Sequence, residues 1–236
     1  CGIMDQFSSY FGKKDSVIFL DCRNLADFQT IPFNFPECVI VIASTNAPHA
    51  LVDGKYDELR GHCFEAAAKF KALLGRDDIT HLRDVSEKEW HAHQSNLGCE
   101  GAMKRSKHII FENQRVLDGV KALNSGDLAT FGAKMTASHV SSRDDFGNSS
   151  EKLNIMFDAA EGLEGCYGRR LMGGGFGGCV ISLVHKDHAA AFQETLNKKY
   201  HAKTGISPIF WVVRMGDGAF AFELDRRAGQ GDFKAN

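Results

Sequence analysis

The sequence predicts an α+β fold, and three features of its pattern lead to this prediction. Between residue 55 and about residue 160, apolar residues recur at three- and four-residue steps, which is the spacing of amphipathic helices. Short β-branched runs at 17–20, 38–43 and 179–184 are typical of strands. Helices and strands thus stand in separate blocks along the chain, whereas an α/β fold would alternate them.

The N-terminal part predicts a short helix followed by strands. Val17–Leu20 follows the break at Asp15-Ser16, and Phe28–Phe33 alternates in the manner of a half-buried strand. Cys38–Ala43 has the length and β-branched content of a buried strand. A loop around Asp53-Gly54 separates these strands from the helical block.

A series of helices is expected in the middle of the chain. The first ends at Gly75, a residue type that suits the left-handed conformation just past a helix, and a short one lies within 86–97. A longer helix closes at Ser125-Gly126, Asp127 N-caps the next, and Ser149 or Ser150 starts another. The side chains expected to face inward include Tyr56, Leu59, Cys63, Ala66, Phe70, Leu73, Ile109, Val116, Val120, Leu123, Leu128, Phe131, Met135, Leu153, Met156 and Phe157.

The C-terminal third predicts strands at 166–171 and 179–184 on either side of a glycine run. A helix capped by Asp187 should follow, with inward-facing Phe192, Leu196 and Tyr200. Residues 209–224 contain two apolar runs around Gly216-Asp217-Gly218, which predicts a β-hairpin.

The composition excludes several classes of partner. A formal charge of −2 over 236 residues offers no bulk attraction to nucleic acid or to an anionic membrane. No apolar run approaches the roughly 18 residues that a membrane span requires. We therefore expect neither nucleic acid nor a membrane as partner, and no feature indicates an oligomeric state.

The cysteines predict a reducing location. Their number, seven, is odd, and no Cys-x-x-Cys pair occurs, so neither a disulfide framework nor a zinc knuckle is expected. This usage suggests a cytoplasmic protein. The chain also opens with Cys1-Gly2 and without an initiator Met, so we expect that it begins within a longer protein.

The glycine run Gly173–Gly178 has two competing interpretations. Its letters fit G-x-G-x-x-G, but a dinucleotide fingerprint requires a helix after it, and Cys179–Val184 reads as a strand. No Gly-Lys-Ser/Thr closes it as a Walker A loop. A wide turn between strands would suffice, yet five glycines in six positions exceed what a turn needs. This density favours a loop whose backbone approaches a ligand or another loop.

Several polar residues have a plain structural interpretation. Asp5 falls in a predicted first helical turn, where a carboxylate is stabilised by the helix dipole without any further role. His108 and His139 are expected to pack or cap within helices. The polar stretch that contains His81, His91, His93 and Cys99 lacks metal-ligand spacing and is expected to be a solvated surface. Trp90 and Trp211 are expected to be core or edge aromatics, and Arg143-Asp144-Asp145 to brace the glycine run.

Taken together, motifs along the chain resemble those of the galactokinase family within the GHMP kinases. Gly2-Ile3-Met4-Asp5-Gln6 resembles the motif that carries the family's catalytic aspartate, and Gly173–Cys179 resembles the third GHMP signature, G-G-G-F-G-G-C. Supporting matches lie between them, in family order, at 55–67, 82–84, 105–117 and 138–146. The resemblance extends over residues 1 to about 224.

The resemblance implies a two-domain GHMP kinase fold. Residues 1–50 would be a remnant of the N-terminal catalytic domain. Residues 51–224 would form a C-terminal α+β domain with helices on one face of an antiparallel sheet, and residues 225–236 a flexible tail.

The resemblance also implies a reaction, the transfer of the ATP γ-phosphate to the C1 hydroxyl of galactose. Asp5 would be the catalytic base, while Gly2 and Tyr56 would contact the sugar through backbone and phenol. The loop would lie beside the triphosphate, through Gly173, Gly174, Gly175, Phe176, Gly177 and Gly178. Mg²⁺ is implied as well, with its ligands outside this chain, so no metal-binding residue is expected here.

Some positions depart from the family pattern. Met172 stands where a Thr or Ser usually precedes the glycines, and Gly147-Asn148-Ser149 replaces a more apolar continuation. The family's acidic sugar motif and its Gly-Leu-Ser-Ser-Ser phosphate loop match no segment of the chain. These 236 residues alone are therefore expected not to phosphorylate galactose. A non-catalytic sugar sensor, or a kinase for a related hexose such as N-acetylgalactosamine, is the alternative.

Overall fold

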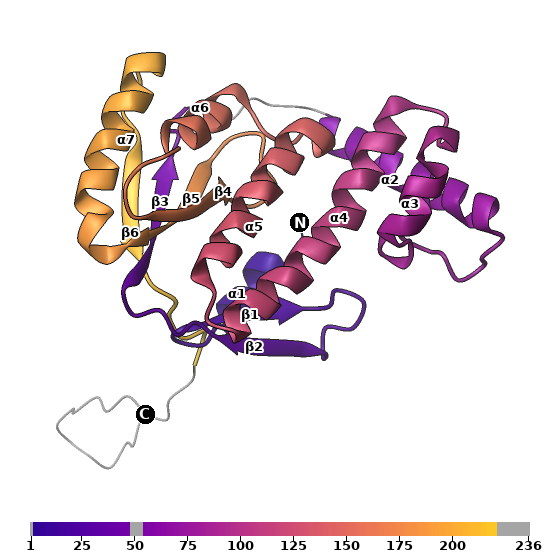
Figure 1. Cartoon of the computed structure of the whole chain (residues 1–236), viewed down its shortest axis with the longest axis horizontal. Coiled ribbons are helices and arrows are strands. Elements are labelled where there is room, and N and C mark those ends of the chain that lie inside the picture. The colour runs from indigo at the N-terminus through magenta and orange to yellow at the C-terminus, as the bar shows by residue number, and fades with distance from the viewer. Residues whose placement is uncertain (1, 48–53, 221–236) are drawn as a thin grey trace, which may run out of the picture. The chain divides into compact units, whose positions relative to one another are not determined.

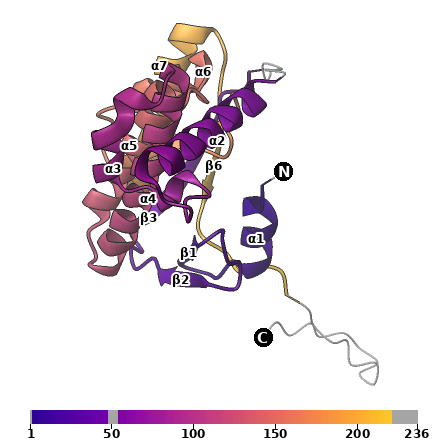
Figure 2. The same ribbon diagram turned by 90° about the vertical axis from the view of Figure 1, so that its right-hand side faces the viewer.

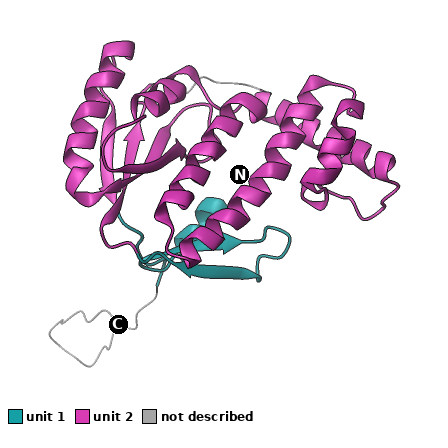
Figure 3. Cartoon of the chain, viewed as in Figure 1, with its two compact units in different colours: residues 1–34, 214–236 teal, residues 35–213 magenta. Residues whose placement is uncertain are grey.

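The computed structural model describes residues 2–47 and 54–220. It divides into two compact units, residues 1–34 with 214–236 and residues 35–213 (Figure 3). This division does not coincide with the predicted boundaries at residues 50 and 224, which stay a prediction about the domains of the family. The predicted tail at 225–236 lies outside the described residues.

The first unit is built on a helix and a hairpin. Helix α1 (Met4–Phe11) precedes the antiparallel strands β1 (Ser16–Leu20) and β2 (Phe28–Pro32). The buried ring of Phe7 lies 5.1 Å, edge to face, from the ring of Phe28, so the aromatic face of α1 packs on the hairpin. The predicted short helix and strands are confirmed here.

The returning C-terminal segment corrects one prediction. Residues 214–220 form no strand, so the hairpin predicted at 209–224 is wrong for the part that the structure describes, and 221–224 lie outside it. Gly218 N–H instead donates to the carbonyl of Gly12 at 2.8 Å, and Ala219 N–H to that of Ser9. A Cβ on Gly218 would lie 2.6 Å from the Tyr10 carbonyl, so a glycine permits this close backbone approach.

The second unit contains a four-stranded antiparallel sheet in the order β4-β5-β3-β6. Its strands are β3 (Cys38–Ser44), β4 (Cys166–Leu171), β5 (Cys179–His185) and β6 (Ile209–Val213). β3 therefore occupies an inner position beside strands that follow it by more than a hundred residues along the chain. The strands predicted at 38–43, 166–171 and 179–184 are confirmed.

One face of this sheet carries the main core. Val39, Val41 and Ala43 alternate along β3 and are buried in one core with residues of α6 (Glu151–Ala159) and α7 (Ala189–Thr204), the helices that lie beside the sheet in Figure 1. The inward residues predicted for both helices are buried. The predicted cap is wrong, because α7 begins after His188 and Asp187 lies in a 3₁₀ turn.

The remaining helices pack on one another, and all but the last of them surround a second core. They are α2 (Lys55–Leu74), α3 (Glu87–His93), α4 (Glu100–Asn124) and α5 (Leu128–Ser141) (Figures 1 and 2). Short 3₁₀ turns lie at Leu82–Asp84, Gln94–Asn96 and Lys186–His188, and a π-helical turn, η3, at Ser142–Phe146. None of the described helices is long and apolar enough to cross a bilayer.

The helix boundaries were predicted better than their buried faces. Gly75 ends α2 in the left-handed conformation, and Asp127 N-caps α5 by accepting from Thr130 N–H. Val116, predicted to face inward, is 44% exposed. On α5 the buried face includes Gly132 and His139, whereas the predicted Phe131 and Met135 are only half-buried. Small and polar residues face inward on α5 because this helix lies close against β4.

Candidate functional site

The glycine run forms the turn between β4 and β5, and it has an unusual backbone. Gly173, Gly175 and Gly178 have φ angles of +69°, +83° and +85°, in the left-handed region that glycine adopts without strain. Phe176 also has a positive φ, of +60°. Because a bulky residue rarely adopts this conformation, the surrounding contacts must hold the loop in place.

Asn148 holds the middle of this loop. Its carbonyl accepts from Phe176 N–H at 2.6 Å, and its side-chain amide donates to the Gly174 carbonyl at 3.1 Å. A Cβ on Gly175 would lie 2.0 Å from the same Asn148 carbonyl. The loop thus approaches Asn148 as closely as two backbones can, which requires glycine at this position.

Thr45 holds the end of the loop. The Gly178 carbonyl accepts from both Thr45 N–H, at 2.9 Å, and the Thr45 hydroxyl, at 3.0 Å. The Thr45 carbonyl in turn accepts from the hydroxyl of the buried Tyr200, at 2.9 Å. The loop is therefore tied to the main core as well as to Asn148.

The tip of the loop is open. Gly173 and Gly174 are exposed, and a Cβ built on either would meet no atom within 4 Å. The loop is consequently rigid on one side and accessible on the other, the arrangement in which backbone N–H groups can approach a ligand.

We expect Gly175→Ala to disturb this loop and Gly174→Ala to leave it intact. The Cβ at 175 collides with a backbone carbonyl and meets an unfavourable φ, whereas the Cβ at 174 enters open space. The expected cost for Gly175→Ala is about 1–3 kcal/mol of unfolding free energy. Urea denaturation of the two variants measures this difference, and equal midpoints would contradict it.

Asn148 is positioned by a network between α4 and α5. His108 Nδ1 lies 3.0 Å from the Ser141 hydroxyl, and Lys107 forms an ion pair with Asp145 at 2.9 Å. Arg105 donates to the Asp145 carbonyl. Two motifs that are far apart in the sequence, at 105–117 and 138–146, therefore act together to hold η3 and, after it, Asn148.

Glu112 completes this network. It is largely buried, accepts from Ser138, and pairs with Arg115 at 2.6 Å. Burial alone would raise the pKa of Glu112, but the bonds from Ser138 and Arg115 outweigh it and hold the pKa below its usual value. Glu112, within the 105–117 motif, is thus an ionised residue that links α4 to α5.

Arg143, Asp144 and Asp145 were predicted to brace the glycine loop, and of these Asp145 contributes indirectly, through the network that holds η3. The ion pairs that the structure shows run instead from Arg143 to Asp144, at 2.7 Å, and to Asp158, at 3.6 Å. The loop is held by Asn148 and Thr45, which sequence reasoning missed. The departure from the family pattern at Gly147-Asn148-Ser149 was the available signal for Asn148.

His139 anchors the start of the loop. It is fully buried and stacks on Phe157, and its Nδ1 accepts from Leu171 N–H at 2.9 Å, next to Met172. Accepting at Nδ1 places the proton of the neutral ring on Nε2. Burial, with the nearby Arg143, lowers the pKa of His139 to about 4, and burial likewise lowers that of His108 to about 4. Both histidines are buried, which confirms the prediction that they pack within the fold.

These two histidines predict an acid-sensitive fold. Their folded pKa lies below the unfolded value of about 6.5, so the unfolded chain binds more protons between pH 6.5 and 4. The contribution of these two histidines to the free energy of unfolding is fully present above pH 6.5. It decreases as the pH falls, by roughly 3 kcal/mol per histidine at pH 4. His139→Asn keeps an acceptor for Leu171 and removes the titration. Denaturation curves from pH 7 to 4 should therefore show a weaker pH dependence in this variant, and an unchanged slope would refute the assignment.

Asp5 and Gly2 belong to the first unit. Asp5 is exposed in the first turn of α1, and the described bonds use its backbone carbonyl, which accepts from the Ser8 hydroxyl at 3.2 Å. Gly2 is exposed immediately before this helix. The carboxylate thus lies at the positive end of a helix and is accessible to a ligand.

Tyr56 belongs to the second unit, in the first turn of α2, where its side chain is 66% exposed. It was predicted to face inward along the helix and also to contact sugar. Its exposure contradicts the first prediction, while the contact with sugar stays a prediction. The glycine loop belongs to the same unit as Tyr56, although the two are far apart in the sequence.

One cluster of candidate metal ligands in the described residues has donors that do not suit Mg²⁺. Within residues 2–47 and 54–220, the group of three or more candidate ligands is His62, Glu65 and Cys99. Mg²⁺ prefers an all-oxygen shell, and this set offers nitrogen and sulfur.

Comparison with known proteins finds a family model that matches part of the second unit. Residues 120–202 match the family model of the GHMP kinases C terminal domain. Galactokinases from Clostridium acetobutylicum and Roseiflexus are 40% and 38% identical to the chain over 93% and 92% of its length. The match covers 55% and 54% of those relatives, so the chain spans about half the length of the curated proteins it matches.

A solved structure agrees with this. The crystal structure of Lactococcus lactis galactokinase complexed with galactose matches 92% of the chain and 55% of its own length, with a TM-score of 0.85 and 35% identity. The α+β class predicted from the sequence pattern and the antiparallel sheet implied by the resemblance are confirmed. Residues 120–202 are therefore similar to the C-terminal domain of GHMP kinases, and most of the chain is similar to about half the length of galactokinases.

Proposed function

We propose that this chain supplies part of the active site of a galactokinase, which transfers the γ-phosphate of ATP to the C1 hydroxyl of galactose. The observation that carries the proposal is the glycine loop, braced at Gly175 and Gly178 and open at Gly173-Gly174. Similarity to galactokinases over 92–93% of the chain supports the choice of reaction. The free cysteines of the described chain support a reducing, cytoplasmic location.

Asp5 is proposed as the residue that receives or holds the proton of the attacking hydroxyl. A carboxylate suits this role when it lies within hydrogen-bond reach of the hydroxyl, and Asp5 is exposed for such contact. Gly2, just before it, is proposed to approach the sugar through its backbone, and Tyr56 through its phenol.

The glycine loop is proposed to lie beside the phosphates. Its exposed Gly173 and Gly174 allow backbone N–H groups to approach anionic oxygens without a side chain between them. ATP supplies the phosphoryl group, and the transfer depends on positioning and on stabilising the charge of the phosphate oxygens. A rigid brace of the loop by Asn148 serves the positioning.

A chimera tests the proposal. The part of the Clostridium acetobutylicum galactokinase outside the match is fused to this chain, and ATP turnover is measured by a coupled assay with galactose, with N-acetylgalactosamine and without sugar. Galactose-dependent turnover by the chimera, and none by the 236-residue chain alone, is expected. A folded chimera that binds galactose without turnover would instead favour the sugar-sensing alternative.

A further inference from the structure

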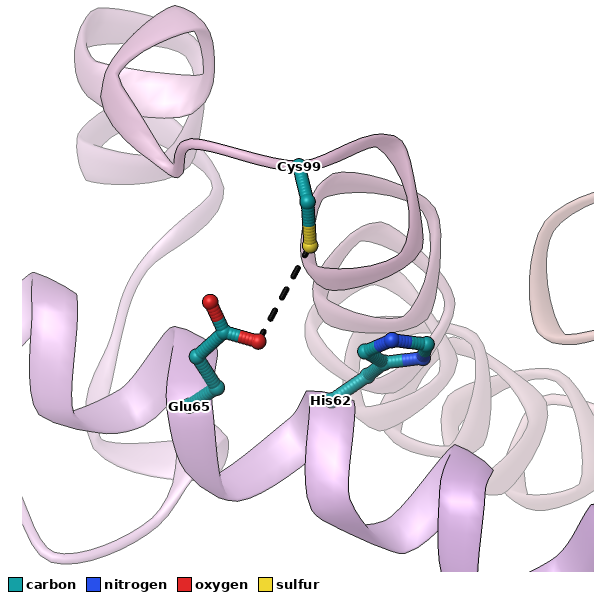
Figure 4. A group of neighbouring side chains, drawn as sticks. All are labelled: His62, Glu65 and Cys99. Carbon is teal, nitrogen blue, oxygen red and sulfur yellow. Dashed lines mark hydrogen bonds between the residues drawn. The ribbon is translucent and has the colours of Figure 1, made fainter.

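His62, Glu65 and Cys99 meet on the surface of the second unit, away from the glycine loop. One ligand atom of each lies within 4.8 Å of the others. Cys99 Sγ is 3.8 Å from Glu65 Oε2, as the dashed line in Figure 4 shows. His62 and Glu65 are three residues apart on α2, so they project from one face of the helix toward Cys99.

The backbone holds Cys99 in place. Cys99 N-caps α4, and its sulfur accepts from Ala102 N–H at 3.3 Å. This fixes the sulfur in the position that a metal-bound thiolate would occupy, with the positive end of a 25-residue helix behind it. A sulfur held in this way need not reorganise to bind a cation.

His62 is held in place and lacks a partner. Its Nδ1 is buried, with no hydrogen-bond partner among the described atoms. A Cβ at position 101 would lie 2.5–2.8 Å from the imidazole ring, so Gly101 leaves the space that the ring occupies. The imidazole thus lies beside a thiol and a carboxylate, with one ring nitrogen within 4.8 Å of both.

The donor types select the metal. Imidazole nitrogen, carboxylate oxygen and thiolate sulfur together suit Zn²⁺, which takes four ligands in a tetrahedron. Three protein ligands leave one position for water. Lys69 pairs with Glu65 Oε1 at 2.6 Å, so the metal would use Oε2, the oxygen that already faces Cys99.

We propose that His62, Glu65 and Cys99 form a zinc site that clips α2 to the start of α4. On binding, the Cys99 thiol releases its proton to water as the zinc–sulfur bond forms, and a water completes the shell. The site is independent of the proposed kinase reaction. The stretch around Cys99 was expected to be a solvated surface without a metal site. The proposed site instead pairs Cys99 with His62, a histidine on α2, and does not use His81, His91 or His93.

Cobalt is the most direct probe, because Co²⁺ takes the same geometry and absorbs light. The 236-residue chain, purified under reducing conditions and stripped with a chelator, is titrated with CoCl₂. A sulfur-to-cobalt charge-transfer band in the near ultraviolet should appear at one equivalent, and Zn²⁺ should displace it. The midpoint temperature of thermal unfolding should rise when the free Zn²⁺ concentration exceeds the dissociation constant of the site.

Matched variants separate the site from general effects. Cys99→Ser keeps an N-cap oxygen and should abolish the band while the fold survives; Cys22→Ser makes the same change at another exposed cysteine and should keep the band. Glu65→Gln should weaken Zn²⁺ binding at least tenfold. Glu194→Gln breaks an equivalent i,i+4 pair, with Lys198, and should leave binding unchanged.

Three outcomes overturn the proposal. These are a titration without a charge-transfer band, a band that persists in a folded Cys99→Ser chain, and zinc binding that His62→Gln does not alter. Circular dichroism of each variant shows that it is folded, so that loss of binding reports on the ligand and not on the helix.

Discussion

Asp5→Asn in the chimeric enzyme is expected to lower kcat by about 10²–10⁴-fold, the range that a positioned acid or base contributes. Asparagine has nearly the same shape but cannot accept the proton of the C1 hydroxyl. Affinity for galactose should change little, because the amide still occupies the same position in the first turn of α1.

A control separates this effect from the helix dipole. Glu151 is an exposed acidic residue in the first turn of α6, so Glu151→Gln removes the same kind of helix-end charge in the second unit. It should leave kcat unchanged. Steady-state kinetics and isothermal titration with galactose measure both variants, and a change below threefold for Asp5→Asn would remove the base from the mechanism.

Gly132→Ala and Gly168→Ala are expected to destabilise the second unit by about 3 kcal/mol or more each, at the upper end of what overpacking costs. A Cβ on Gly132 would lie 2.1 Å from the Tyr167 carbonyl, and one on Gly168 would lie 2.1 Å from the Gly132 carbonyl. Because both obstacles are backbone atoms, α5 and β4 would have to move apart, and the bond from Leu171 to His139 would lengthen with them.

The matched change is Gly61→Ala on α2, where a Cβ meets no atom within 4 Å. This variant should be more stable than the original chain by up to about 1 kcal/mol, the difference in helix propensity between the two residues. Urea denaturation followed by circular dichroism measures all three. Equal stabilities for Gly132→Ala and Gly61→Ala would show that the α5–β4 approach is looser than the structure has it.

Helix caps were predicted correctly from the sequence, whereas the buried face of a helix was not always predicted. Ser150 and Asp127 cap helices as expected, because a cap bonds to a backbone N–H two or three residues away and so depends only on local sequence. Val116 fits an apolar stripe by spacing and yet is exposed, because α4 turns other residues toward α2 and α5. Periodicity identifies a helix, but the position of its neighbours decides which side is buried.

The sequence by itself determined most helix and strand positions, the α+β class and the glycine loop, since these follow from spacing, caps and residue types within a few positions. Only the tertiary structure decided that Asn148 and Thr45 hold that loop, that Gly132 lies against Gly168, and that His62 and Glu65 face Cys99. Each of these contacts joins residues that are distant in sequence. Such pairs are set by how helices and strands pack, and no local pattern records that packing.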